Sequence, residues 1–207
     1  MKKILITVFS IIMLCHVRFT IADQTIEIPA DTDEQIIYQI NNPDEDILND
    51  EITLTNGLQK LYYDSENIKA EGNVKNRQKE GDWKIYYPGT EGKTLKAHGL
   101  YIKDKRNGQW ITYYENGRVN SKLAYKNDLL NGIVYEFSES GVPLSEILYK
   151  NNIIDGVYKQ YYQDGNPKEI SMYSKGKKNG TENLFYPNGK RMSIGQYKNG
   201  IRDGLWK

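Results

Sequence analysis

Residues 107–117 read NGQWITYYENG, an aromatic pair held between two glycine-containing turns. Similar stretches are EGDWKIYYPG at 80–89, DGVYKQYYQDG at 155–165 and NGTENLFYPNG at 179–189. Asn-Gly and Asp-Gly pairs favour the positive φ angles of tight hairpin turns. With a turn about every dozen residues, the segments between turns are roughly five to eight residues long, which is typical of strands rather than helices. The stretch therefore predicts a β-hairpin that the chain repeats.

The turns recur with a fixed period. Glycines 108, 132, 156, 180 and 204 are 24 residues apart, as are Gly57 and Gly81, and an extension in PGTEGK (88–93) lengthens the interval between Gly81 and Gly108 to 27. Periods of this length indicate a repeat array. We therefore predict an all-β fold, an elongated single-layer antiparallel sheet of stacked β-hairpin repeats. Six units and a seventh stub fill residues 57–207.

Positions are counted from the glycine that begins each unit. Because side chains alternate along a strand, the fifth position should face away from the second and sixth positions. The fifth position always carries an aromatic ring, whereas the second includes Val134 and Glu182 and the sixth includes Ser138. An unpaired charge is costly to bury. We therefore expect the fifth position and the late tyrosines (101, 125, 149, 173 and 197) in the core, and the second and sixth positions on a solvent-exposed face.

This second-and-sixth face is the predicted binding surface. Two interpretations of it remain open. The rings could stack as cross-strand pairs that stabilise a thin sheet, or they could form an interaction site, as large exposed apolar patches usually do. The candidate binding residues are Trp83, Tyr87, Trp110, Tyr114, Tyr158 and Tyr162.

The N-terminus resembles an export signal. Lys2 and Lys3 precede an apolar run, residues 4–15, and Thr20-Ile21-Ala22 offers a small-residue cleavage site. The run is shorter than the roughly 20 residues of a membrane span. We predict a signal peptide over 1–22 and export to the periplasm, cell surface or medium. Arg18 is unusual so close to a cleavage site, so an uncleaved membrane anchor is the alternative.

Composition disfavours several classes of function. The chain has 28 basic and 27 acidic residues, and removing residues 1–22 takes away three basic ones, so the net charge falls from +1 to −2. A nucleic-acid-binding protein would need a clustered basic excess. The only cysteine, Cys15, lies within the predicted signal. Residues 23–56 form an acidic leader, in which QIIYQI (35–40) or EITLT (51–55) is predicted to cap the first strand.

The sequence offers no constellation for catalysis. His98 has no serine nucleophile or metal-ligand cluster near it in the sequence, and glycine turns such as GKKNG (176–180) lack the order of a phosphate loop. Every unit repeats the same chemistry, whereas an active site needs a unique set of groups. We predict no catalytic residue, no metal site and no cofactor.

Two repeat families resemble this pattern. GQWITYYENGRVNSKLAYKNDLLNG (108–132) and GTENLFYPNGKRMSIGQYKNGIRDG (180–204) resemble the bacterial variant of the MORN repeat, including YwqK-type antitoxins. The resemblance covers 57–207 and implies a non-catalytic interaction scaffold with a protein partner; Val74, Val134, Ser138 and Glu182 depart from the pattern. GDWKIYY (81–87) also resembles cell-wall binding repeats, which hold choline or glucans between aromatic rings. A glycan-binding module and an antitoxin-like inhibitor are therefore the alternative functions.

Overall fold

The computed structural model describes residues 16–21, 24–29, 54–64 and 66–207, which belong to two compact units, 1–41 and 42–207. In the first unit, β1 (His16–Ile21) pairs antiparallel with β2 (Gln24–Pro29). These strands flank the predicted cleavage site after Ala22, and cleavage remains a prediction. QIIYQI and residues 51–53 of EITLT lie outside the described residues. Within the described ranges, no helix has the length and apolarity that a membrane span requires.

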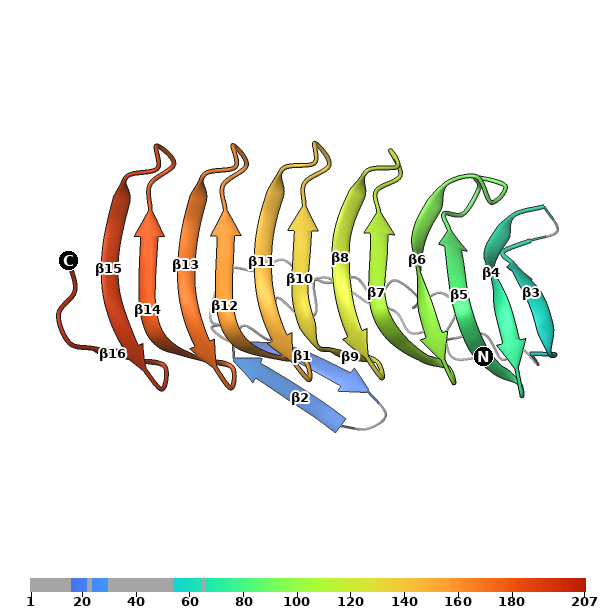
Figure 1. Ribbon diagram of the computed structural model, residues 1–207, viewed down its shortest axis with the longest axis horizontal. Helices are drawn as coiled ribbons and strands as arrows, with labels where there is room; N and C mark the ends of the chain where they lie inside the picture. The colour runs from blue at the N-terminus through green and yellow to red at the C-terminus, as the bar shows by residue number, and fades with distance from the viewer. Residues whose placement is uncertain (1–15, 22–23, 30–53, 65) are drawn as a thin grey trace. The chain divides into compact units, whose positions relative to one another are not determined.

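The second unit is one antiparallel sheet of 14 strands (Figure 1). Its strands follow the chain order from one end of the sheet to the other, except that β9 pairs only with β8. The all-β, single-layer hairpin array predicted from the period is thus confirmed. The strands are β3 (Gly57–Tyr62), β4 (Ile68–Lys75), β5 (Gln78–Tyr86), β6 (Leu95–Ile102), β7 (Lys105–Tyr113), β8 (Val119–Lys126), β9 (Leu129–Leu130), β10 (Gly132–Phe137), β11 (Pro143–Lys150), β12 (Ile153–Tyr161), β13 (Pro167–Ser174), β14 (Lys177–Phe185), β15 (Arg191–Lys198) and β16 (Ile201–Asp203).

Two kinds of tight turn alternate along the sheet. Between β8 and β9, Asn127 and Asp128 both have positive φ, 52° and 67°, as the favoured two-residue hairpin turn requires. At the opposite rim, the N–H of Gly117 donates to the carbonyl of Tyr114, and the N–H of Tyr114 donates to the carbonyl of Arg118. This second pattern, with Gly117 at φ 80°, is a longer hairpin loop that needs a residue in the left-handed region. The mid-unit Asn-Gly and Asp-Gly pairs therefore form turns as predicted. The pairs that begin the units do not: Asn107-Gly108 lies within β7, at an irregularity in its pairing with β6, and the turn precedes it at Lys103 and Asp104.

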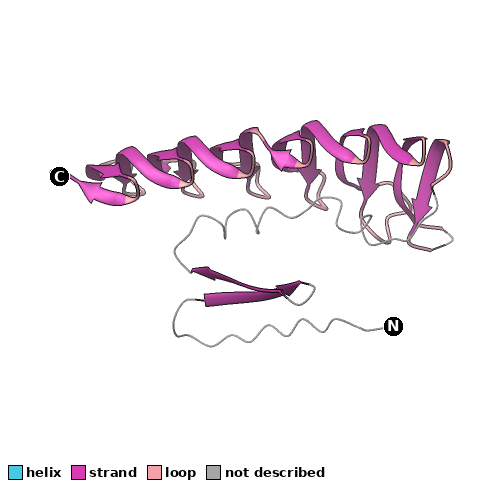
Figure 2. Ribbon diagram, turned by 90° about the horizontal axis from the view of Figure 1, so that it is seen from below, coloured by secondary structure: helices cyan, strands magenta, loops and turns pink. Residues whose placement is uncertain are grey.

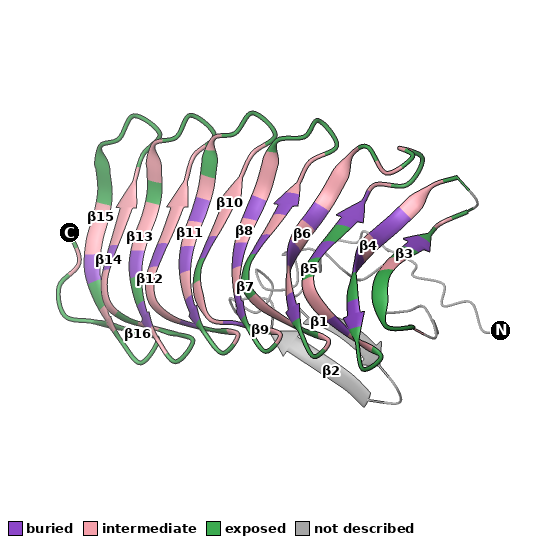
Figure 3. Ribbon diagram, turned by 45° about the vertical axis from the view of Figure 1, so that its right-hand side comes forward, coloured by how far each residue is buried: buried purple, intermediate pink, exposed green. Residues whose placement is uncertain are grey.

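The strands are bent along their length (Figure 2), and buried residues recur in strand after strand (Figure 3). One face of the sheet holds most of the buried side chains. We call this the inner face and the opposite one the outer face. The late tyrosines lie on the inner face, where Tyr101, Tyr125, Tyr149 and Tyr173 are buried as predicted. The ring of Tyr101 makes edge contacts with both Trp83 and Trp110, with centroids 6.0 and 5.0 Å apart.

The prediction that the second position faces solvent is wrong. Trp83 and Trp110 are both 0% exposed, and Tyr158 is 5% exposed. The rings of Trp83 and Trp110 occupy the space that a side chain would fill at Gly72 and Gly99, where an added Cβ would lie within 2.4 Å of each ring. From Trp83 onward, each second-position residue thus lies across from the residue 11 positions earlier on the neighbouring strand.

The second position therefore varies within the interior, together with the residue opposite it, and not because it is exposed to solvent. In the three pairs whose earlier residue is glycine, the second position is tryptophan, and the other three pairs combine two side chains that are both larger than glycine. Because an interior must be filled without voids or clashes, the indole fits where the opposing residue has no side chain. The successive pairs are Gly72–Trp83, Gly99–Trp110, Leu123–Val134, Ile147–Tyr158, Ser171–Glu182 and Gly195–Trp206.

Glu182 is buried because it has partners. It is 3% exposed, lies opposite Ser171, and accepts a hydrogen bond from the ammonium group of Lys178. The same ammonium lies 2.8 Å from Glu169, whose carboxylate accepts a hydrogen bond from the Ser171 hydroxyl. Burial lowers the pKa of Lys178, but the hydrogen bonds to Glu169 and Glu182 outweigh it and raise that pKa above its usual range. A buried charge at a core position is thus paired, which the sequence argument did not allow for.

The fifth-position aromatics do not form the core either. They lie on the outer face, where Tyr62 is 50% exposed and Tyr113, Phe137 and Tyr161 are half-buried. Tyr86 is buried and donates its hydroxyl hydrogen bond to Glu71 at 2.7 Å. The alternation along the strand was predicted correctly, but the second position, rather than the fifth, shares the inner face with the late tyrosines.

Candidate functional site

The sixth-position tyrosines connect successive units at one rim of the sheet. The hydroxyl of Tyr87 donates to the carbonyl of Tyr113 at 2.7 Å, and the hydroxyl of Tyr114 donates to the carbonyl of Phe137 at 2.7 Å. Tyr63 and Tyr162 make the same bond to Tyr86 and Phe185. These bonds fix each ring between two units. Ser138 interrupts the series, and its hydroxyl bonds within its own turn, to Ser140 and to the N–H of Val142.

The six predicted binding residues therefore do not share one open surface. Trp83, Trp110 and Tyr158 are buried on the inner face, and the indole N–H groups of Trp83 and Trp110 donate to the carbonyls of Asn73 and Leu100. Tyr87, Tyr114 and Tyr162 are half-buried at the rim. Of the six, the structure brings two together in a hollow, Tyr87 and Tyr114.

We call this site the rim hollow. Its volume is about 420 Å³, and its lining comprises Tyr87, Tyr114, Glu115, Asn116 and Glu139. Both carboxylates are on exposed turn residues. The pKa of Tyr87 is raised by burial and by the charge of Glu115, and the pKa of Tyr114 is raised by burial and by the charges of Glu139 and Glu136. Two carboxylates together with two tyrosine rings in its lining make this hollow suited to a cationic group.

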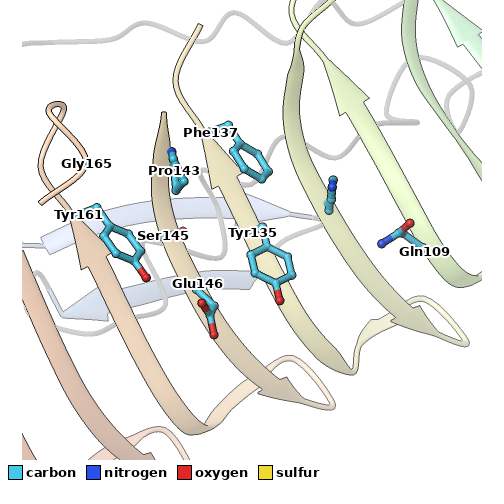
Figure 4. Close-up of a pocket in the computed structure, with 9 residues that line it drawn as sticks. Gln109, Tyr135, Phe137, Pro143, Ser145, Glu146, Tyr161 and Gly165 are labelled. Carbon is cyan, nitrogen blue, oxygen red and sulfur yellow. The ribbon is translucent and has the colours of Figure 1, made fainter. Parts of the chain in front are cut away.

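A second site, which we call the outer hollow, lies on the outer face (Figure 4). Its volume is about 480 Å³. None of its lining residues was predicted from the sequence to bind a ligand. Tyr135 could have indicated the site, because the third position of the other units holds Lys60, Lys84, Ile111, Lys159 or Asn183. The lining residues are Gln109, Lys122, Tyr135, Phe137, Pro143, Ser145, Glu146, Tyr161 and Gly165.

The described residues offer little for metal binding or acid–base chemistry. Within those ranges no group of three or more histidine, cysteine or acidic side chains could hold a metal ion. His98 stacks on Tyr113 with ring centroids 5.9 Å apart, and its Nε2 lies 3.1 Å from the Tyr113 hydroxyl. This residue is thus part of the packing on the outer face.

Comparison with known families agrees with this architecture. The MORN repeat variant matches residues 55–76, 106–127, 130–151, 154–175 and 178–199, which together make up more than half of the chain. The chain belongs to the MORN repeat variant family. Repeats of this family are commonly protein- or membrane-interaction modules and are generally non-catalytic scaffolds. A comparison with curated proteins found no relative.

The matched segments of this MORN-variant protein leave out residues 77–105, which contain the three-residue extension. This stretch still forms the hairpin of β5 and β6 in register with its neighbours. The extension is accommodated in the turn, where Gly89, Glu91 and Gly92 have positive φ. The repeat thus continues through a unit whose turn departs from the family pattern.

Proposed function

We propose that this protein is an exported, non-catalytic scaffold that binds a protein partner through the rim hollow. The observation that carries the proposal is the pairing of two immobilised tyrosine rings with two carboxylates in one hollow of about 420 Å³. Export is supported by the signal-like sequence of residues 1–22.

The partner group that fits is a lysine or arginine side chain. A cation over a tyrosine face is attracted by the ring, by about 0.5–1 kcal/mol at an exposed site and more when desolvated. Glu115 and Glu139 add charge attraction on the open side of the hollow. Arg118 donates to the main-chain carbonyl of Glu139 at 3.0 Å rather than to its carboxylate, which leaves that carboxylate open to a partner.

The hollow is also preorganised. Because the hydroxyls of Tyr87 and Tyr114 already bond to the next unit, the two rings lose little freedom when a partner binds. Rigid aromatic side chains bury area at low entropic cost, which is why Tyr is enriched at binding hot spots. A rigid sheet that presents such a site is suited to recognition rather than to chemistry.

A photo-crosslinking residue in place of Asn116, on cells that produce the protein, tests this function. We expect a discrete protein adduct that disappears when both Glu115 and Glu139 are changed to Lys and persists in Asp82→Lys, an exposed carboxylate outside the hollow. An adduct that survives the double charge reversal would contradict the proposed site.

Export has its own test. We expect fractionation to place the protein outside the cytosol and N-terminal sequencing to find a start near Asp23. An intact chain in the cytosol would contradict export and favour the antitoxin-like alternative.

A further inference from the structure

The outer hollow has the size and composition of a small-ligand site. Its volume of about 480 Å³ lies within the range of roughly 300–1,000 Å³ that such sites occupy. It extends over β7, β8, β10, β11 and β12, and it shares no residue with the rim hollow. The two hollows are therefore separate sites on the same sheet.

Aromatic rings form the walls of the outer hollow. Tyr135 projects from β10 and Tyr161 from β12, on either side of Glu146 on β11, and Phe137 lies beside them (Figure 4). All three rings are half-buried, so each keeps part of its surface open. Strands two steps apart are about 10 Å apart, so a ligand with two linked rings can reach both tyrosines.

The polar groups of the hollow are mixed in charge. The carboxylate of Glu146 lies 3.0 Å from the ammonium group of Lys159. Lys122 lies over the ring of Phe137, 5.7 Å from its centroid, and Gln109 is an exposed amide. A cationic ligand would meet two ammonium groups, and an anionic ligand would meet the carboxylate. A purely apolar ligand would cover these polar groups without giving them hydrogen bonds, which is costly.

A neutral polyhydroxylated ring compound satisfies all of these conditions. The C–H face of a sugar ring packs on an aromatic ring, while its hydroxyls donate and accept hydrogen bonds. We propose that the outer hollow is a saccharide-binding site, in which Tyr135, Phe137 and Tyr161 stack on sugar rings. Gln109, Lys122 and Glu146 bond the hydroxyls.

The site binds but does not cleave. Glycoside hydrolysis normally uses two carboxyl groups on either side of the scissile bond. Glu146 is the only carboxylate among the residues that line the outer hollow. A bound saccharide would therefore remain intact, in keeping with the scaffold character of the repeats.

Saturation-transfer NMR and titration of the full-length protein with cellobiose, maltose and N,N′-diacetylchitobiose test this site. We expect at least one of these sugars to bind saturably, and Tyr161→Ala to weaken its binding about tenfold or more. Tyr113→Ala is the matched control, because Tyr113 is a half-buried fifth-position ring outside the hollow. It should leave the affinity unchanged.

Gln109→Ala provides a second variant whose exposed position does not threaten the fold, and it should also weaken binding. Circular dichroism verifies that each variant is folded. The proposal is overturned if none of the three sugars binds saturably, or if Tyr113→Ala reduces the affinity as much as Tyr161→Ala does. Because the rim hollow is untouched by these changes, crosslinking at Asn116 should persist in all of them, which separates failure of this site from failure of the proposed protein interaction.

Discussion

The inner face is filled in two different ways by the same repeat. In the N-terminal units, Trp83 and Trp110 lie over glycines, and a buried cation beside them, Lys79, lies over the Tyr101 ring, 4.4 Å from its centroid. In the sixth unit, toward the C-terminal end, the corresponding space holds Glu182 with its charged partners Lys178 and Glu169.

The strands and register are equivalent in both regions, so the repeat requires each cross-strand pair to fill the interior but does not fix the residue types. What differs is the origin of stability at the second position, which is hydrophobic burial at Trp83 and Trp110 and ion pairing at Glu182.

Removing a tryptophan tests the aromatic end and should have the largest effect. Trp110→Ala should lower the free energy of unfolding by about 3–5 kcal/mol, as for other buried aromatic truncations, because the indole is fully buried and leaves a cavity over Gly99. Urea unfolding followed by circular dichroism measures the loss. Tyr113→Ala, on the outer face, should cost much less. Equal losses would mean that the inner face does not carry the core.

Removing the cation tests the charged end. Lys178→Met should lower the free energy of unfolding by about 2–3 kcal/mol, because the two largely buried carboxylates of Glu169 and Glu182 then lose the cation that they share. Lys177→Met, the adjacent exposed lysine, is the control and should change stability by less than about 0.5 kcal/mol. If both variants were equally stable in urea, the C-terminal interior would not depend on its ion pairs.

The charged end should also respond to alkaline pH. The pKa of Lys178 is raised in the folded protein, so its contribution is fully present below the unfolded pKa of about 10.4 and is lost as pH rises through the folded value. The difference in stability between wild type and Lys178→Met should therefore shrink above about pH 10.4, by at most about 1.4 kcal/mol per pH unit. Urea titrations at pH 9, 10 and 11 provide the measurement. A constant difference would contradict the raised pKa.

The smallest expected loss of stability is at the rim of the sheet. Tyr87→Phe should cost about 0.5–1.5 kcal/mol, because it removes the hydrogen bond to the Tyr113 carbonyl while keeping the ring. Tyr186→Phe, whose ring is exposed, serves as the control and should be close to neutral in thermal unfolding. A loss as large as that of Trp110→Ala would show that the rim, and not the inner face, dominates stability.

The period and the mid-unit Asn-Gly and Asp-Gly pairs were sufficient to predict the sheet, because turn chemistry acts locally, although the pairs that begin several of the units lie within strands. The wrong assignment of the second and fifth positions had a different cause. Variation at the second position was interpreted as exposure, whereas Val134 and Glu182 are matched to Leu123 and Ser171 on the neighbouring strand. The 11-residue spacing that reveals this pairing is present in the sequence, but its meaning depends on the strand register.

The candidate sites were predictable only in part. Tyr87 and Tyr114 were chosen as aromatic residues on a shared face, and they do line one hollow, but Glu115 and Glu139 join them only because neighbouring turns lie side by side. The outer hollow depends on side chains from five strands, and only Tyr135 stands out in the sequence as a departure from the repeat. Volume enclosed between units does not follow from the composition of any one unit.

Ser138 weakens the connection between two neighbouring units of the sheet. Each hydrogen bond from a sixth-position tyrosine to the next unit resists the separation of one hairpin from the next. This hydrogen bond is missing where Ser138 replaces tyrosine. The joint between the fourth and fifth units should therefore be the softest, with a lower resistance to bending than the joints beside it. The outer hollow spans this joint, since Phe137 and Tyr161 lie on its two sides. A ligand bound there would bridge the two units, and its binding would therefore increase the bending stiffness of the whole array.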